Sequence, residues 1–229
     1  MISETLLAKG HTSFWSEYTP WLNSYTQIIN KRYLSQPFGA LQDVDDPKNR
    51  SINGILSFNY YMQWSLTGKP KIKDVFELSK AEIERFPRNN LNEYSIDPIN
   101  TKLVESMALR MKTTIDDDVL FHPFFPGCGI LSNCEGDLVS NMTLVEIKTG
   151  DRQILPSDIR QLIIYSALNH LANNPYEINE ISYFNPRKGS LWHIGIIDLF
   201  SSISNLPFSD FAYELESYLI SQSQEFNPN

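Results

Sequence analysis

Apolar residues recur at helical spacing through much of the first 95 residues. Thr19-Pro20 has the form of an N-cap followed by proline at the first helical position. The residues that would then share one helical face are Trp21, Leu22, Tyr25, Ile28 and Ile29. We expect further helices at Ser51–Leu66 and Asp74–Phe86, and polar loops at Phe38–Ser51 and Pro87–Asn100.

The pattern changes after Thr101, where strand-like segments alternate with helical ones. In chain order we expect a helix at Lys102–Lys112, a strand at Val119–Phe125, a hairpin pairing 135–139 with 144–148, a helix capped by Ser157-Asp158 and running to about Asn173, strands at Ile178–Phe184 and Leu191–Leu199, and a helix at Asp210–Ser221. This order predicts an α/β fold, with α+β as the alternative, in which helices flank a central mixed sheet. We divide it into a helical N-terminal lobe, residues 1–95, and a core, residues 96–229, which could form one compact domain.

Composition narrows the functional classes. The 229 residues carry a formal net charge of −8, which argues against a surface coated in basic residues for non-specific nucleic-acid binding. Five acids and no Lys or Arg fall between Gly189 and Asn229, so much of the acidity belongs to the tail. We see no transmembrane run and no secretory signal, and the two cysteines, Cys128 and Cys134, are expected to be reduced in a cytoplasmic protein.

The chemistry is concentrated in the predicted hairpin. Glu146 and Lys148 are two residues apart on one strand and therefore point to the same face. Asp137 ends the partner strand, where pairing can place its carboxylate beside that of Glu146. Two carboxylates this close repel each other unless a cation joins them. Mg²⁺ prefers one or two carboxylates together with water and phosphate oxygens, so the hairpin predicts a magnesium site.

A second element follows on the next predicted helix. Gln161 and Tyr165 are spaced i, i+4 and share one helical face, with Arg160 beside them. Glutamine can both donate and accept hydrogen bonds, and tyrosine offers a hydroxyl or a ring. Either element alone is common in proteins, either as charges on an edge strand or as polar groups on a helix border. Their order along the chain is what makes them informative together.

Taken together, Asp137, the Glu146-Ile147-Lys148 tripeptide, Gln161 and Tyr165 resemble the signature of the PD-(D/E)XK nuclease superfamily, in particular its RecB-like branch. The resemblance covers about a quarter of the chain. It implies a restriction-endonuclease-like core and phosphodiester hydrolysis that depends on Mg²⁺ or Mn²⁺. No Walker A sequence is present, so any unwinding would require a separate helicase or ATPase partner.

The resemblance also assigns roles. Asp137 and Glu146 would bind the metal with the carbonyl of Ile147, and Lys148 would be the catalytic lysine. Glu105, on the helix before the hairpin, and His122 are further candidate ligands. The cysteine cluster of the iron–sulfur members is absent, so we expect no iron–sulfur cluster.

Three interpretations remain open at this point. The first is a DNA nuclease acting in repair, recombination or antiviral defence, alone, as a homo-oligomer or with a protein partner, and with no membrane association. Its phosphate contacts would come from Lys69, Lys71, Lys73, Arg152, Arg160 and Arg187. The second is a catalytically silent, nuclease-like binding or assembly subunit. The third is an effector nuclease directed at RNA.

Overall fold

The computed structural model describes residues 1–41, 49–86 and 89–225. Helices before the sheet are α1 (Glu4–Lys9), α2 (Thr12–Tyr18), α3 (Leu22–Ile28), the π-helical turn η1 (Ile29–Tyr33), α4 (Arg50–Thr67), α5 (Ile72–Glu84) and α6 (Pro98–Thr114). Strands are β1 (Val119–Phe121), β2 (Phe124–Phe125), β3 (Cys134–Glu135), β4 (Leu138–Ser140), β5 (Thr143–Ile147), β6 (Glu180–Asn185) and β7 (Ser190–Gly195). The later helices are α7 (Pro156–Leu171), α8 (Ile196–Ile203) and α9 (Phe208–Glu225).

The sheet is mixed, which confirms the predicted α/β fold. Five strands lie in the order β1-β4-β5-β6-β7, and β2 and β3 form a separate pair. Neighbouring strands are antiparallel except β5 and β6, which are parallel and joined by α7. A parallel connection needs a crossover, and a helix is its usual form. The helix carrying Gln161 and Tyr165 therefore directly follows the strand carrying Glu146.

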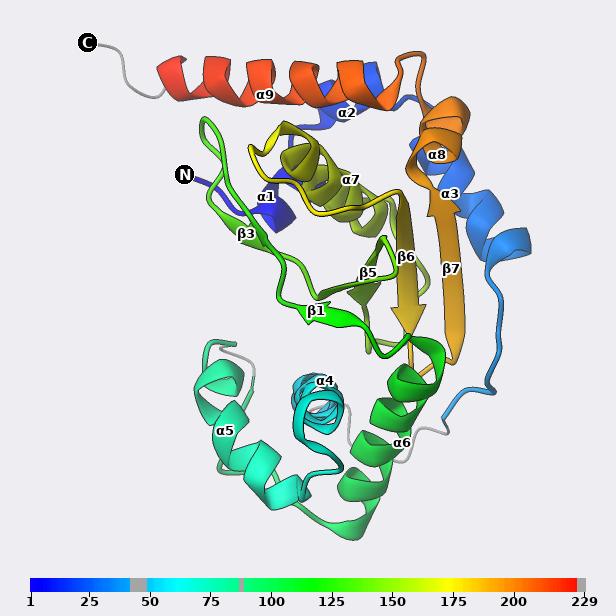
Figure 1. Ribbon diagram of the computed structural model, residues 1–229, viewed down its shortest axis with the longest axis vertical. Helices are drawn as coiled ribbons and strands as arrows, with labels where there is room; N and C mark the ends of the chain where they lie inside the picture. Colours follow the sequence, from blue (N-terminus) through cyan, green and yellow to red (C-terminus); the bar gives the residue numbers. More distant parts are fainter. Residues whose placement is uncertain (42–48, 87–88, 226–229) are drawn as a thin grey trace.

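Helices cover both faces of the sheet (Figure 1). Leu144 and Tyr183 face a core shared with α7, α8, α9 and the N-terminal helices α1–α3. Val145 and Phe184, one residue further along each strand, face a core shared with α4, α5 and α6. This alternation follows from the two-residue period of a strand. The described helices of the first 95 residues thus lie on both sides of the sheet.

Most predicted elements are confirmed, including the helices at Ser51–Leu66 and Asp210–Ser221 and the hairpin. The helix predicted from Thr19 begins instead at Leu22, because Thr19 is the C-cap of α2, with a non-helical φ of −133° and ψ of 56°. Trp21 and Ile28 are consequently exposed, whereas Leu22 and Ile29 are buried.

Two predicted strands are shorter than expected. The segment Val119–Phe125 breaks at His122, whose φ of 52° cannot continue a strand, so β1 and β2 enter different sheets. The segment Leu191–Leu199 ends as a strand at Gly195 and continues as α8. Residues 196, 199, 200 and 203 are buried in α8, and their helical spacing was already visible in the sequence.

Two helices, α7 and α6, begin a few residues before the predicted positions. Helix α7 begins at Pro156, and Asp158 acts from its third position by accepting from the N–H of Leu155 at 2.8 Å. The loop predicted at Pro87–Asn100 ends at Pro98, where α6 begins. Residues 42–48 and 87–88, within the two predicted loops, lie outside the described residues. Among the helices described, none combines the length and apolarity that crossing a bilayer requires.

Candidate functional site

The β4–β5 hairpin brings the two predicted carboxylates together. Its turn, residues 141–142, has φ values of 47° and 60°, which are typical of the type I′ turns that match the twist of paired strands. The ladder places Leu138 opposite Val145. The preceding residue, Asp137, therefore lies across from Glu146. A short local connection thus fixes the separation of the two acids.

Two groups of hydrogen bonds hold the predicted residues, one on Asp137 and one that runs from Glu146 to Tyr165. The N–H of Ile147 donates to Oδ2 of Asp137 at 2.6 Å. Nζ of Lys148 donates to Oε1 of Glu146 and, at 3.2 Å, to Oε1 of Gln161. Nε2 of Gln161 in turn contacts the hydroxyl of Tyr165 at 2.8 Å. Lys148 is therefore held between the strand carboxylate and the helix amide.

The two carboxylates of the site, Asp137 and Glu146, face only one positive side chain in this set, that of Lys148. Glu146 is only 3% exposed, and burial followed by the charge of Asp137 raises its pKa to about 8. Burial likewise raises the pKa of Asp137, against the lowering influence of Lys148 and the N–H of Ile147. Burial lowers the pKa of Lys148, but the two carboxylates raise it more, so the net direction is upward. One ammonium group compensates two carboxylates incompletely.

This deficit fits a divalent cation. Two neighbouring carboxylates and a backbone carbonyl are oxygen donors of the kind that Mg²⁺ accepts, and Mg²⁺ uses few protein ligands because it retains water. A cation would also relieve the cost of burying two like charges. Within the described residues, no three His, Cys, Asp or Glu side chains form a ready metal cluster. Water and substrate oxygens would have to complete the coordination.

Two further candidate ligands have different outcomes. The N–H of His122 donates to the carbonyl of Asp137 at 3.0 Å, and its ring lies edge-on to Phe58, so His122 borders the site. Glu105 accepts from the hydroxyl of Tyr60 at 3.1 Å and lies 4.0 Å from Lys69. The structure therefore does not bring Glu105 to the other acids.

Helix geometry explains why Glu105 is remote. Phe58 lies on the face of α4 toward Asp137, within a cleft that both residues line. Tyr60 follows two residues later and so points about 200° around the helix. Its partner Glu105 therefore lies beyond α4. The carboxylate that does line the cleft is Glu82 of α5, which accepts from Nδ2 of Asn59 at 2.7 Å and raises the pKa of Asp137.

The sequence prediction missed Glu82 because four elements, α6 and β1–β3, separate its helix from the hairpin. Its local pattern, one acid among several on an amphipathic helix, resembles an ordinary solvated face. Only the packing of α5 against α4 brings it near the hairpin.

Three of the predicted phosphate-binding cations have internal partners. Arg152 pairs with Asp158, with Nη2 to Oδ1 at 2.7 Å. Arg160 donates to the carbonyl of Ala8 at 3.1 Å, with its guanidinium 5.2 Å from the centre of the Trp15 ring. Arg187 is 2% exposed, and its Nε donates to the carbonyl of Thr149 at 2.6 Å. These arginines support the fold around the site.

The remaining cations are exposed but distant. Lys69, Lys71 and Lys73 lie at the start of α5, whereas Glu82 is near its end. At 1.5 Å per residue, Lys73 is about 14 Å along the helix from Glu82. The ammonium of Lys69 lies 5.7 Å from the centre of the Trp64 ring. The lysine cluster therefore has no place beside the reactive groups.

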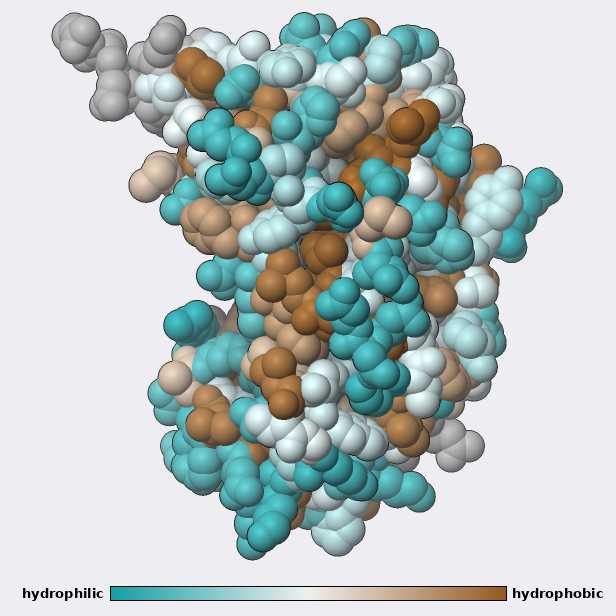
Figure 2. All heavy atoms as spheres, viewed as in Figure 1, coloured by the Kyte–Doolittle hydropathy of each residue, from teal (hydrophilic) through white to brown (hydrophobic). Residues whose placement is uncertain are grey.

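A cleft of about 390 Å³ opens beside Asp137 and Lys148. One wall is formed by Asp137 and the segment Ile147–Gly150, and the other by α4 and the end of α5. Figure 2, in the view of Figure 1, is hollowed between the surface over β3 and the surface over α5. Asp137 and Lys148 reach solvent through this cleft, whereas Glu146 itself is only 3% exposed.

Close backbone packing holds the two walls together. A Cβ built on Gly54 of α4 would lie 2.1 Å from Oγ1 of Thr149, so only glycine fits this contact without movement. Arg50 of α4 forms an ion pair with Asp151. Helix α4 is therefore fixed against the loop that follows Lys148.

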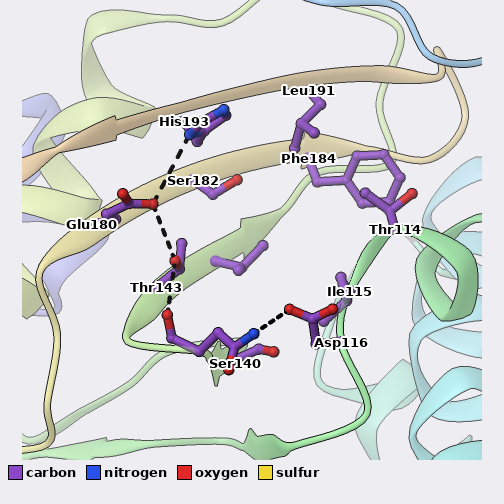
Figure 3. A pocket seen from close by; sticks show the side chains of 12 residues that line it. Thr114, Ile115, Asp116, Ser140, Thr143, Glu180, Ser182, Phe184, Leu191 and His193 are labelled. Atoms are coloured by element: carbon purple, nitrogen blue, oxygen red, sulfur yellow. Dashed lines mark hydrogen bonds and ion pairs between the residues drawn. The ribbon is translucent and has the colours of Figure 1, made fainter.

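A second hollow, of about 310 Å³, lies at the other end of β5 (Figure 3). Figure 3 shows Glu180 between His193 and Thr143, with Asp116 across the hollow. Oγ1 of Thr143 lies 3.4 Å from Oε2 of Glu180. None of the residues predicted to carry chemistry lines this hollow. We therefore place the candidate site in the cleft beside Lys148.

The two cysteines lie apart from this chemistry. Burial raises the pKa of Cys128 to about 11 and that of Cys134 to about 12, so both thiols are protonated at neutral pH. Sγ of Cys134 donates to the carbonyl of Ser132 at 3.1 Å. They are packing groups in the apolar core beneath α7.

Comparison of this chain with protein-family models, with curated proteins and with solved structures finds no match in any of the three. The resemblance to PD-(D/E)XK nucleases therefore depends on the residues and their arrangement alone.

Proposed function

We propose that this protein is a nuclease of the PD-(D/E)XK type that hydrolyses phosphodiester bonds in DNA with the aid of Mg²⁺ or Mn²⁺. The observation that carries the proposal is the hydrogen-bonded set of Glu146, Lys148, Gln161 and Tyr165, with Asp137 beside it. Glu146 is buried, and Asp137 and Lys148 are half-buried beside it. Charged groups withdrawn from water in this way are costly, and proteins keep them chiefly where they perform chemistry. Their opening into a cleft makes a purely structural role a poorer explanation.

Asp137, Glu146 and the carbonyl of Ile147 would hold the metal, which when bound would polarise the phosphodiester and activate a water molecule. Lys148 carries a positive charge at the cleft wall, where it would offset the negative charge that develops on the phosphate. Gln161 accepts from Nζ of Lys148 and so sets the direction of that ammonium group. Tyr165 positions the amide of Gln161 in the same way.

The test is a cleavage assay on linear duplex, circular and single-stranded DNA, and on RNA, in Mg²⁺, Mn²⁺ or EDTA. We expect metal-dependent cleavage by the wild type and its loss in Lys148→Met and Asp137→Asn. Lys112→Met is the matched control, because Lys112 also pairs with an acid, Asp117, but on the surface. Cleavage of RNA alone would reassign the substrate. Equal activity in the wild type and both site variants would refute the proposed mechanism.

A further inference from the structure

The α5 side of the cleft ends in an exposed aromatic ring. Phe86 lines the cleft together with Asp137 and Lys148, and it is 50% exposed. A half-exposed phenylalanine alone is common, but this one lines the same cleft as two of the proposed reactive groups. Ile55 and Phe58 of α4 extend the same wall. Among the described residues that line this wall none is Lys or Arg, most are apolar, and the charged one is Glu82.

The opposite wall, formed by Lys148, Thr149 and Gly150, offers polar groups. The carbonyl of Thr149 accepts from Nε of Arg187, and the carbonyl of Gly150 accepts from Nδ2 of Asn185 at 2.7 Å. In a trans peptide the N–H points opposite to the carbonyl, so the N–H groups of Gly150 and Asp151 point away from these interior partners. Thr149 and Gly150 line the cleft, and a Cβ on Gly150 would meet no atom within 4 Å. This wall therefore combines backbone donors with the ammonium of Lys148.

We propose that the cleft binds an unpaired nucleotide next to the cleaved phosphate, with its base stacked on Phe86. The inference rests on the proposed nuclease function and adds its substrate class, single-stranded or frayed DNA. The phosphate lies on the wall of Lys148 and the Gly150 N–H, where donors and positive charge are available. The base lies on the apolar wall, where Glu82 repels phosphate but can accept from an amino group of a base.

An unpaired base fits this wall better than an intact duplex does. Both faces of a paired base are already stacked on its neighbours, whereas an unpaired base has a face free for an aromatic side chain. Extruding a base from a duplex costs a few kcal/mol, and a single strand does not bear this cost. A duplex would also bring the phosphates of its second strand toward the carboxylate of Glu82. Single strands should therefore bind more tightly than duplexes of the same sequence.

The test measures binding of fluorescent single-stranded and duplex oligonucleotides by anisotropy, in Ca²⁺ to prevent turnover. We expect Phe86→Ala to weaken single-strand binding roughly 5- to 150-fold, the range for losing one base–aromatic stack. Phe86→Trp should retain binding and gain a fluorescence change on adding the strand. Tyr213→Ala is the matched control, because Tyr213 is an aromatic residue of α9 that is 58% exposed and lines none of the hollows described above. Circular dichroism verifies that each variant folds.

A scan of abasic positions tests the contact directly. An abasic residue at the stacked position should weaken binding to the wild type, and it should have little further effect on Phe86→Ala. If the wild type cleaves DNA but Phe86→Ala binds as tightly, or if duplex binds more tightly than single strand, the stacking inference is wrong and the nuclease function stands. If the wild type neither binds nor cleaves any nucleic acid, the nuclease function itself is wrong.

Discussion

Substituting Gly54 by alanine tests whether α4 really packs against the loop after Lys148. Gly54 lies within α4, and an ordinary Gly→Ala change inside a helix stabilises a protein by ~1 kcal/mol. Here the new Cβ would lie 2.1 Å from Oγ1 and 3.1 Å from Cβ of Thr149, so rotating the threonine side chain does not relieve the contact fully. Overpacking of this kind costs ~1–3 kcal/mol. We therefore expect a net loss of stability where helix propensity alone predicts a gain.

The net loss is at most ~2 kcal/mol, the overpacking cost less the helix gain, which lowers the Tm by up to roughly 8 °C in a chain of this length. Because Thr149 adjoins Lys148, DNA cleavage should also fall, by up to ~100-fold for a shift near 1 Å. Thermal denaturation and the cleavage assay measure both effects. Gly150→Ala is the stability control, and Thr149→Ala should partly rescue the Gly54 variant. A Tm that rises by a few degrees in Gly54→Ala would refute the packing argument.

The remaining predictions concern metal, positioning and charge. Mg²⁺ or Mn²⁺ at 100 times its Kd should stabilise the wild type by about 2.7 kcal/mol, which is followed as a rise in Tm. Asp137→Asn should show little rise in Tm, and an equal rise in both proteins would place the metal elsewhere. Gln161→Leu should lower kcat about 10- to 100-fold, whereas Lys148 stays paired with Glu146 and the loss of the Tyr165 contact costs only ~1–3 kcal/mol of stability. An unchanged kcat would exclude a positioning role. Arg160→Met should lower the free energy of unfolding in urea by ~1–2 kcal/mol, because it loses the contacts with Ala8 and Trp15. Its DNA affinity should be unchanged, and weaker DNA binding at equal stability would contradict the internal role of Arg160.

The central part of the site could be predicted from the sequence because it is built from local periodicities. Glu146 and Lys148 share a face through the two-residue period of one strand, and Gln161 and Tyr165 share a face through the helical period. Asp137 needs only the hairpin register, which a two-residue turn determines. The crossover from β5 to α7 then brings the two faces together over a short stretch of chain.

The second wall of the cleft could not be predicted in this way. Gly54 and Glu82 lie in α4 and α5, and Phe86 follows the end of α5. The periodic patterns of these helices specify amphipathic helices but not the surface that each helix packs against. The same limit explains the error over Glu105, which has the expected residue type on the expected helix but lies behind α4. The partners of Arg160 and Arg187 are backbone carbonyls, and a carbonyl leaves no signal in the sequence.

The positions of the cations give the net charge of −8 a specific meaning. Arg152, Arg160 and Arg187 are engaged with the protein itself, and Lys148 is the one basic residue among the described residues that line the cleft. Binding should therefore neutralise about one or two phosphates, and the affinity for single strands should fall only ~3- to 7-fold between 50 and 200 mM salt. Engagement of all six predicted cations would give a fall of roughly 300-fold. A nuclease with so few phosphate contacts would have to select its substrate by shape and stacking, which the proposed contact with Phe86 would supply.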